Sequence, residues 1–421
     1  MAMRKDMAGL WQTVRLDVSL AFRNVLRNRR RSAIGLGAVA AGVIAMLLAS
    51  GFFEWNYNNM RERTIRARIG HIQITARGYA DSGMADPFAY LLPESSDALA
   101  VIESMPEVEV VAPRLVFNGL ISIGDSTVSF LGEGVDPAKE RRLSGALLIR
   151  SGEDLARDDE SAVIVGRGLA ENLGVREGQN VVLLTTTGSG GINAVEVRVK
   201  GIFETATKAY DDYAIRIPLK VAKTLLRVSG AHVWLVLLHR TRDTDAVAEA
   251  LQRNPKLAKL DVTPWHETAV ADFYNKTVSL FSKQVTVVKI MIAVIIVLSI
   301  ANTMMTNVRE RIGEIGTCMA LGDRRVTVLR RFLAEGAVLG LIGGTAGIVL
   351  GIGLAHLISW VGIPMPPPPG MASGFDSGIL VTPHLVGEAL ALSIFTAFLA
   401  GVYPAWKASR MPIHDAIRQA R

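Results

Sequence analysis

The chain has 421 residues, of which 50% are hydrophobic and 20% are charged, and its formal net charge is +7. A mean hydropathy of +0.30 with long uncharged runs is unusual for a soluble domain, so the composition predicts membrane spans. The basic residues lie beside those runs, which favours membrane topology over nucleic-acid binding. A single cysteine, Cys318, excludes an internal disulfide, so any soluble domain must depend on its apolar core.

The first 31 residues form a basic leader with an apolar stripe at helical spacing, made of Val14, Val18, Ala21, Phe22, Val25 and Leu26. The stripe predicts an amphipathic helix on the inner leaflet, and the alternative is a solvated leader. The run that follows, residues 32–54, exceeds the about 7–15 apolar residues of a signal peptide, so we expect a span rather than a cleaved leader.

Three further apolar runs are long enough to cross a bilayer, which takes about 20 residues in a helix. They predict spans within residues 265–312, 336–361 and 384–406. The first of these, which is the second span of the chain, is apolar only from Ile290 to Val308. Its earlier part, from Asp272 to Lys283, is therefore expected to stand above the membrane.

Arginine and lysine residues flank the spans on one side. Eight lie in the leader, six between Arg309 and Arg331, and four in the tail, residues 407–421. By the positive-inside rule these segments are cytoplasmic, and so are both termini. Residues 55–264 and the loop 362–383 then lie outside, as expected for a multi-pass protein of a bacterial inner membrane.

The segment 55–264 is long enough for a core, in two lobes by its length. Alternating and β-branched runs predict strands at His71–Ala76, Leu115–Ile123, Val128–Gly132, Ala162–Val165, Val181–Thr186, Val195–Ile202 and Val233–His239. Helical patterns interrupt them at Gly168–Leu173, Leu219–Arg227 and Asp243–Arg253. The pattern predicts an α+β domain. The Gly-rich stretch Thr185–Gly191 lacks the Lys of a phosphate loop and predicts a hairpin turn.

A long helix is predicted to lead from this domain into the second span. Thr263 and Pro264 have the residue types of an N-cap and a first helical position. No Gly or Pro occurs from Trp265 to Ile312, a run of 48 residues. A continuous helix of that length would measure roughly 70 Å and could carry motion across the membrane. The alternative is a kink near Lys283.

Short motifs occur in a fixed order along the chain. They are Arg311–Gly316, Ala320–Gly322, Phe332–Glu335 and Gly401–Arg410 with Pro412 and Ala416–Arg418, preceded by Gly70–Ile74 and Val163–Val175. This ordered set covers nearly the whole chain and resembles the FtsX/MacB/Lol permease family. The resemblance implies four spans, a periplasmic core domain between the first two, and a cytoplasmic elbow, residues 313–335, that docks on an ABC ATPase dimer.

The resemblance also implies that ATP and Mg are bound by the ATPase rather than by this chain, and that a second permease copy or homologue completes the complex. The coupling residues it assigns are Arg311, Glu314, Ile315, Gly316, Met319, Ala320, Leu321 and Gly322. Met319 and Asp323 depart from the family pattern, which usually has a basic residue and Ala there. Apolar Ile312, Ile315, Met319 and Leu321 would form an exposed docking patch, unless they pack on the chain's own leader helix.

The loop 362–383 contains a proline run that favours a stiff extended rod. Its possible cargo or gate contacts are Met365, Pro366, Pro367, Pro368 and Met371, and the alternative is a spacer without cargo contact.

No phosphate loop, zinc-peptidase motif or nucleophile elbow occurs, so we expect no catalytic or metal site. With few ionisable groups in the spans, an apolar or amphipathic cargo is favoured over an ion. The leading hypothesis is a Lol-type permease that extracts a lipoprotein or lipid for a periplasmic carrier. The alternatives are a MacB-like efflux permease with a periplasmic adaptor and an FtsX-like regulator of cell-wall hydrolases that does not transport.

Overall fold

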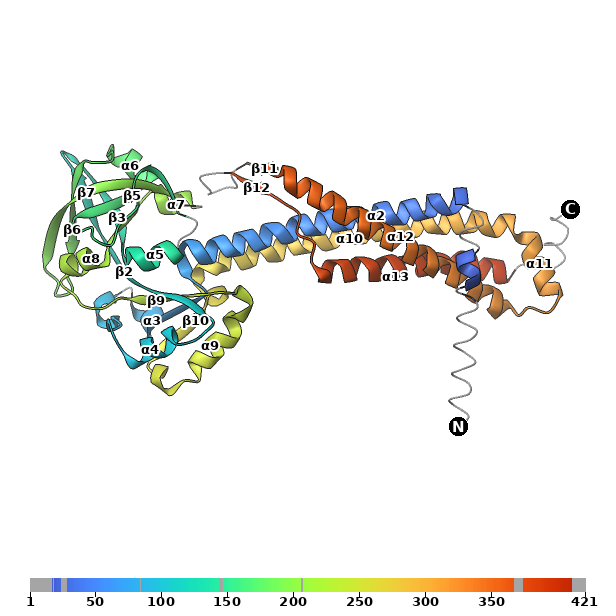
Figure 1. Ribbon diagram of the computed structural model, residues 1–421, viewed down its shortest axis with the longest axis horizontal. Helices are drawn as coiled ribbons and strands as arrows, with labels where there is room; N and C mark the ends of the chain where they lie inside the picture. Colours follow the sequence, from blue (N-terminus) through green and yellow to red (C-terminus); the bar gives the residue numbers. More distant parts are fainter. Residues whose placement is uncertain are drawn as a thin grey trace. The chain divides into compact units, whose positions relative to one another are not determined.

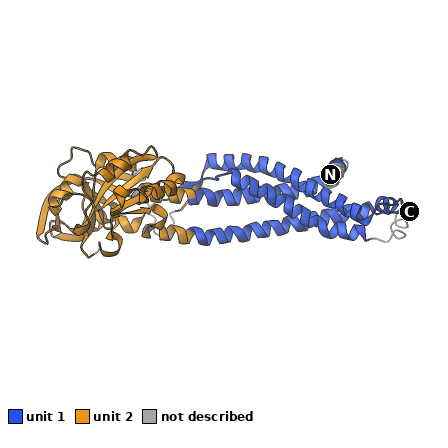
Figure 2. Cartoon of the chain, turned by 90° about the horizontal axis from the view of Figure 1, so that it is seen from below, with its two compact units in different colours: residues 1–57, 278–363, 376–421 blue, residues 58–277, 364–375 orange. Residues whose placement is uncertain are grey.

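The computed structural model describes residues 17, 19–23, 29–83, 85–143, 147–205, 207–366 and 374–410. The chain divides into two compact units (Figure 2). Residues 1–57, 278–363 and 376–421 form the helical unit, and residues 58–277 and 364–375 form the inserted domain. Most of the leader stripe and the tail beyond Arg410 lie outside the described residues.

The helical unit is built from long helices (Figure 1). They are α2 (Arg29–Thr64), α10 (Ala269–Glu310), α12 (Arg325–Val361) and α13 (Pro383–Ser409), with the short α11 (Ile312–Ala320) between α10 and α12. Among the described residues, these four long helices are long and apolar enough to cross a membrane, which confirms the predicted spans. Three of them are longer than predicted: α2 continues past residue 54, α12 begins before residue 336, and α13 continues past residue 406.

The predicted start of the long helix is wrong. Thr263 and Pro264 end strand β10, where they pair with Gln73 and Ile72 of β1, and α10 begins only at Ala269. The backbone hydrogen bonds of the sheet therefore outweigh the helix-capping preference of Thr263 and Pro264. From Ala269 to Glu310 the helix is uninterrupted over 42 residues, so the prediction of a continuous helix through Lys283 holds rather than the alternative of two helices.

Glycines let α12 pack closely against two neighbours. On one face, a Cβ added at Gly340 would lie 2.7 Å from Ala397 Cβ and 2.8 Å from the Ser393 carbonyl oxygen, both on α13. On another face, a Cβ at Gly343 or Gly347 would lie 2.8 Å from Cβ atoms of α2. Small residues spaced by about one helical turn are typical of helix contacts in membranes, where close van der Waals packing replaces the hydrophobic effect.

The inserted domain contains ten described strands in one sheet. They are β1 (Ile72–Ala76), β2 (Val108–Ile123), β3 (Ser126–Val135), β4 (Leu148–Gly152), β5 (Ala162–Gly166), β6 (Asn180–Thr186), β7 (Ile192–Glu204), β8 (Ala214–Pro218), β9 (Val233–Leu238) and β10 (Leu260–Pro264). Its helices are α3 (Tyr79–Ser82), α4 (Asp97–Glu103), α5 (Pro137–Leu143), α6 (Arg167–Leu173), α7 (Lys208–Asp211), α8 (Leu219–Leu226) and α9 (Thr244–Gln252).

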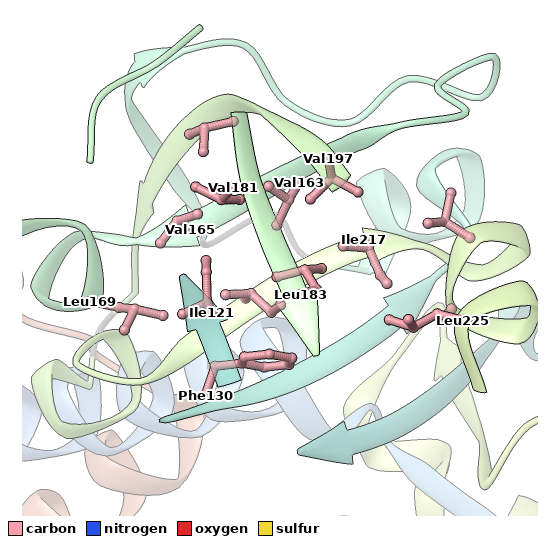
Figure 3. Packing of buried hydrophobic residues seen from close by; sticks show 14 of the residues in the cluster. Ile121, Phe130, Val163, Val165, Leu169, Val181, Leu183, Val197, Ile217 and Leu225 are labelled. Carbon is pink, nitrogen blue, oxygen red and sulfur yellow. The ribbon is translucent and has the colours of Figure 1, made fainter. Parts of the chain in front are cut away.

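Strands β2, β3, β8, β5, β7 and β6 pair in that order, and β6 pairs again with β2, so this part of the sheet closes into a barrel. Closure removes free strand edges, and the alternating side chains fill the interior. Figure 3 shows these buried side chains converging, among them Ile121, Phe130 and Leu183. Thr187 and Gly191 close the β6–β7 hairpin, which confirms the predicted turn.

A second lobe is formed by β10, β1, β9 and the first half of β2, with α4 and α9 packed on it. Its core, which includes Ile74, Trp234 and Leu251, is separate from the barrel core. The separate cores agree with the predicted two lobes. The sequence missed β4, β8 and β10, because β4 is a polar edge strand and the other two contain Pro and charged residues.

Four buried charges form a closed ring where the lobes meet. Arg114 (β2) and Arg216 (β8) alternate with Glu133 (β3) and Glu140 (α5), and each is at most 6% exposed. Arg216 Nε lies 3.0 Å from Glu133 Oε2 and its Nη1 lies 3.2 Å from Glu140 Oε1. Arg114 Nη1 lies 3.5 Å from Glu133 Oε2, and Arg114 Nη2 forms an ion pair with Glu140 Oε1. Burial lowers the pKa of both arginines, but the facing carboxylates more than offset it.

Candidate functional site

The elbow between α10 and α12 carries most of the residues that the family resemblance assigned to ATPase coupling. Helix α10 ends at Glu310, Arg311 leaves the helical conformation, and α11 begins at Ile312. After α11, Gly322 has a φ of +108°, a backbone conformation that L side chains rarely adopt. The chain can therefore reverse into α12 within a few residues.

One side of α11 is buried, which corrects the expectation of an exposed patch. Ile315 and Met319 are 7% and 9% exposed and belong to the apolar core of the helical unit, and Gly316 is buried between them. The amphipathic pattern of α11 thus reflects packing on the chain's own helices rather than docking. Met319, one of the two departures from the family pattern, is apolar because it points into that core.

Ion pairs hold the elbow on the bundle. Arg311 Nη1 lies 3.4 Å from Glu335 of α12, and its Nε donates to Glu314 at 3.0 Å. Arg331 donates to Asp323 at 2.7 Å, so the second departure from the family pattern makes an internal ion pair. Charged pairs that are partly buried constrain geometry more than exposed ones, and we infer that the elbow has a defined shape.

The outward side of the elbow is apolar at its tip. Leu321 is 85% exposed and Val326, in the first turn of α12, is 69% exposed. Ala320 and Gly322 are exposed beside them. We call Ala320, Leu321, Gly322 and Val326 the docking tip. Its small and apolar residues could fill an apolar groove of a partner, and Glu314 and Arg325 add exposed charge nearby.

A strap made of residues 377–380 closes the other end of the helical unit. Leu380 N donates to Gly51 O of α2 at 2.9 Å, and Ile379 N donates to Ser359 Oγ of α12 at 2.9 Å. Asn56 Nδ2 donates to Ser377 Oγ at 3.0 Å. The strap therefore ties α2, at Gly51 and Asn56, and the end of α12 to the segment that starts α13.

The proline-rich loop is described only in part. It begins with β11 (Ile363–Met365), which pairs with β12 (Phe375–Ser377). Met365 is half-buried in β11 and Pro366 is exposed. The other gate residues predicted from the sequence, Pro367, Pro368 and Met371, lie outside the described residues.

In addition to the ion pairs of the elbow, one ion pair joins two of the spans, α10 and α13. Lys289 of α10 donates to both carboxylate oxygens of Glu388 of α13, at 2.7 and 2.8 Å. Ionisable groups near apolar spans are uncommon and usually paired, so this contact fixes α10 against α13. Sequence reasoning missed this pair and Val326. Two opposite charges at the edges of two apolar runs were the available signal for the pair.

Comparison with known proteins agrees with this architecture. Residues 32–254 match the MacB-like periplasmic core domain, and residues 286–413 match the C-terminal region of FtsX-like permeases. Four candidate spans with a folded domain between the first and second have the architecture of a membrane permease. The chain belongs to the MacB/FtsX family of ABC transporter permeases.

Three relatives illustrate the range of the family. The chain is 25% identical to the ABC transporter permease MJ1507 of Methanocaldococcus jannaschii, over 95% of this chain and 97% of that protein. It is 26% identical to the pyoverdine export ATP-binding/permease protein PvdT of Pseudomonas savastanoi and 25% identical to the macrolide export ATP-binding/permease protein MacB of Acinetobacter baylyi. It spans only 59% of that PvdT and 43% of that MacB.

Two solved structures of similar proteins each align with about half of this chain. The extracellular domain of the transporter YknZ from Gram-positive bacteria aligns with 46% of this chain and 98% of its own length, at 15% identity and a TM-score of 0.34. The periplasmic region of MacB from Actinobacillus actinomycetemcomitans aligns with 52% of this chain and 96% of its own length, at 13% identity and a TM-score of 0.36.

Proposed function

We propose that this chain is the permease of an ATP-driven transporter whose ATPase docks on the tip Ala320, Leu321, Gly322 and Val326. The observation that carries the proposal is an apolar tip, with Leu321 85% exposed, on an elbow held by the ion pairs of Arg311 and Asp323. An exposed apolar tip on a fixed frame suits a partner's groove. ATP and Mg belong to that ATPase, because the chain has no phosphate loop.

The basic residues beside the elbow support a cytoplasmic location for it, and with it for both termini, in a bacterial inner membrane. The positions of exposed aromatic residues are consistent with the two membrane–water interfaces. Trp360, 85% exposed, lies near the end of α12, and Tyr403 and Trp406 lie near the end of the neighbouring α13. Tyr and Trp are enriched at membrane–water interfaces. Since α12 and α13 are joined by a reversal of the chain, their ends mark opposite faces of the bilayer.

The second copy of the permease is proposed to pack along α10. Only 11% of the most apolar window of α10 is buried, against 39–44% for the other spans. Exposed Leu280, Val287, Met291, Val294 and Leu298 recur at spacings of seven, four, three and four residues, the pattern of a helix–helix seam. Leu280 and Val287 precede Lys289, where the apolar run has not yet begun, so lipid would not cover these two side chains. The same stripe on a parallel copy of the permease would cover them.

Cross-linking tests this seam. In a Cys318→Ser background, Val287→Cys should form an intermolecular disulfide in the membrane. Ser282→Cys, which lies on the opposite side of the same exposed helix, is the matched control and should not. Equal cross-linking at the two positions would contradict the seam.

The proposed mechanism is mechanical. Closure of the ATPase dimer moves the elbow, and α10 carries the movement to the inserted domain, with Lys289–Glu388 keeping α13 in step. The tight glycine contacts of α12 leave no room for cargo between it and α2 or α13. Cargo would then be handled by the inserted domain, with its periplasmic carrier or adaptor, or between the two permeases.

Two cargo classes remain. We propose extraction of a lipoprotein or lipid from the inner membrane, which suits the close packing of α12 on α2 and α13 and spans with few charges. MacB-like efflux through a periplasmic adaptor is equally supported, because relatives are named for macrolide and pyoverdine export. Mass spectrometry of lipids, lipoproteins and adaptors that co-purify with the complex separates the two. Recovery of a cell-wall hydrolase without cargo would instead favour an FtsX-like regulator.

Docking itself is tested by binding. Leu321→Glu places a charge on the docking tip and should abolish co-purification of the ATPase. Leu148→Glu makes the same change at a half-exposed leucine of β4 in the inserted domain and should leave co-purification intact. Wild-type recovery of the ATPase with Leu321→Glu would refute docking at the tip.

A further inference from the structure

A directed chain of hydrogen bonds links the end of α2 to the sheet of the inserted domain. His71, at the start of β1, is 1% exposed. Its Nδ1 accepts a hydrogen bond from Leu238 N at 3.0 Å, so the proton of the neutral ring is on Nε2. That nitrogen lies 3.0 Å from Thr241 Oγ1, and the Thr241 hydroxyl donates to Glu62 Oε1 of α2 at 2.6 Å.

The proton positions along this series of hydrogen bonds determine one another. Thr241 uses its one hydroxyl proton in the hydrogen bond to Glu62, so its oxygen can accept a hydrogen bond from His71 Nε2–H. A second proton on the ring would displace the Leu238 N–H from Nδ1. Burial lowers the pKa of His71 to about 4, against the partial opposing effect of Glu62, so the ring is neutral near pH 7.

The backbone of the same residue is bonded to the segment that precedes the other long helix, α10. Trp265 N donates to His71 O at 2.9 Å, and Trp265 lies four residues before α10. Around this point Ile65, Ile69, Trp265 and Ala271 pack into one buried cluster with residues of β2 and β9. Gly70, at a φ of +66°, turns the chain from the end of α2 into β1. His71 is thus linked by hydrogen bonds to α2, through Thr241 and Glu62, and to Trp265, which precedes α10.

We propose that His71, Thr241 and Glu62 form the joint through which α2 and α10 move the inserted domain, with His71 as the positioning residue. The inference rests on the proposed function and identifies where its mechanical relay is fastened. Packing in the cluster is apolar and permits sliding, whereas three directional bonds in series fix the rotation of α2 against β1 and β9. Losing one of them leaves the helix and the sheet folded but allows them to turn independently.

The test uses the full chain with its co-purified ATPase in nanodiscs. Cys318→Ser removes the native thiol, and Ser189→Cys, in the exposed β6–β7 turn, takes a spin label in each permease copy. Electron spin resonance distances between the copies are compared without nucleotide and with ATP and vanadate. The wild-type background should show a nucleotide-dependent shift.

Thr241→Val removes the central hydroxyl and should lose at least three-quarters of that shift, with basal ATPase activity within twofold of wild type. Thr241→Ser restores the hydroxyl and should restore the shift. Thr244→Val is the matched control: its hydroxyl donates to the Thr241 carbonyl oxygen in the same segment but contacts neither His71 nor Glu62. It should keep the full shift, which separates the joint from a general loss of stability.

Glu62→Gln separates hydrogen bonding from charge, because the amide oxygen still accepts from Thr241 while the ion pair with Arg66, at 3.8 Å, is lost. It should keep most of the shift. A wild-type shift in Thr241→Val would overturn the joint and leave the proposed function standing. Absence of any shift in the wild-type background, with ATP turnover intact, would overturn the relay and the joint together.

Discussion

Replacing Arg216 with methionine would break the buried ring of charges at its most connected corner. Glu133 would lose its contact with Arg216 at 3.0 Å and keep its contact with Arg114 at 3.5 Å. Glu140 would lose the contact at 3.2 Å but keep its bonds to Arg114. One guanidinium would then face two carboxylates whose residues are only 3% and 6% exposed. Methionine is of similar length and apolar, so the principal effect is an uncompensated charge rather than a cavity.

Removing one partner of a buried ion pair costs about 3–5 kcal/mol, which is a large part of a typical domain's stability. Since about 1.4 kcal/mol corresponds to a factor of ten, opening of the barrel should become roughly 10²- to 4 × 10³-fold more frequent. The double change Arg216→Met with Glu133→Leu leaves Arg114 and Glu140 as a balanced pair. It should therefore recover at least about 1 kcal/mol relative to the single change.

Amide hydrogen exchange of the full chain in nanodiscs measures this opening locally. The amides to follow lie in the parallel pair β3–β8, beginning with Leu131 N, which donates to Tyr213 O at 2.8 Å. Exchange should be fastest in Arg216→Met and intermediate in the double variant. Wild-type exchange in Arg216→Met, or still faster exchange in the double variant, would refute the view that the ring is held by charge balance.

Three other predictions concern pH, helix packing and the long helix. Burial lowers the pKa of His71 and His232 to about 4, so the unfolded chain binds protons first as the pH falls below 6.5. Each histidine should therefore remove about 3 kcal/mol of stability between pH 6.5 and 4, visible as a falling midpoint of tryptophan-monitored unfolding. Gly340→Ala should destabilise the bundle by about 1–3 kcal/mol in thermal melts, whereas Gly353→Ala, whose Cβ meets nothing within 4 Å, should not. A Gly-Pro insertion near Lys283 should leave ATPase docking intact but reduce transport; unchanged transport would rule out the relay through α10.

The candidate site shows the limits of sequence reasoning most directly. The family motifs predicted an elbow at residues 313–335, and α11 and Gly322, with its positive φ, lie at its start, whereas α12 already begins at Arg325. The motifs could not separate Ile315 and Met319, which are buried, from Leu321 and Val326, which are exposed. All four are apolar, and only the neighbouring helices decide which of them loses contact with water.

The sequence alone determined the number and order of the spans, because the bilayer demands long uncharged runs and little else has that composition. It also determined most strands of the inserted domain, whose alternating residues reflect one buried face. Only the tertiary structure decided that Thr263 and Pro264 end a strand, since pairing with β1 outweighs a local helix signal. It also brought Arg114, Glu133, Glu140 and Arg216 together from four separate elements, because each charge is stable there only in the presence of the other three.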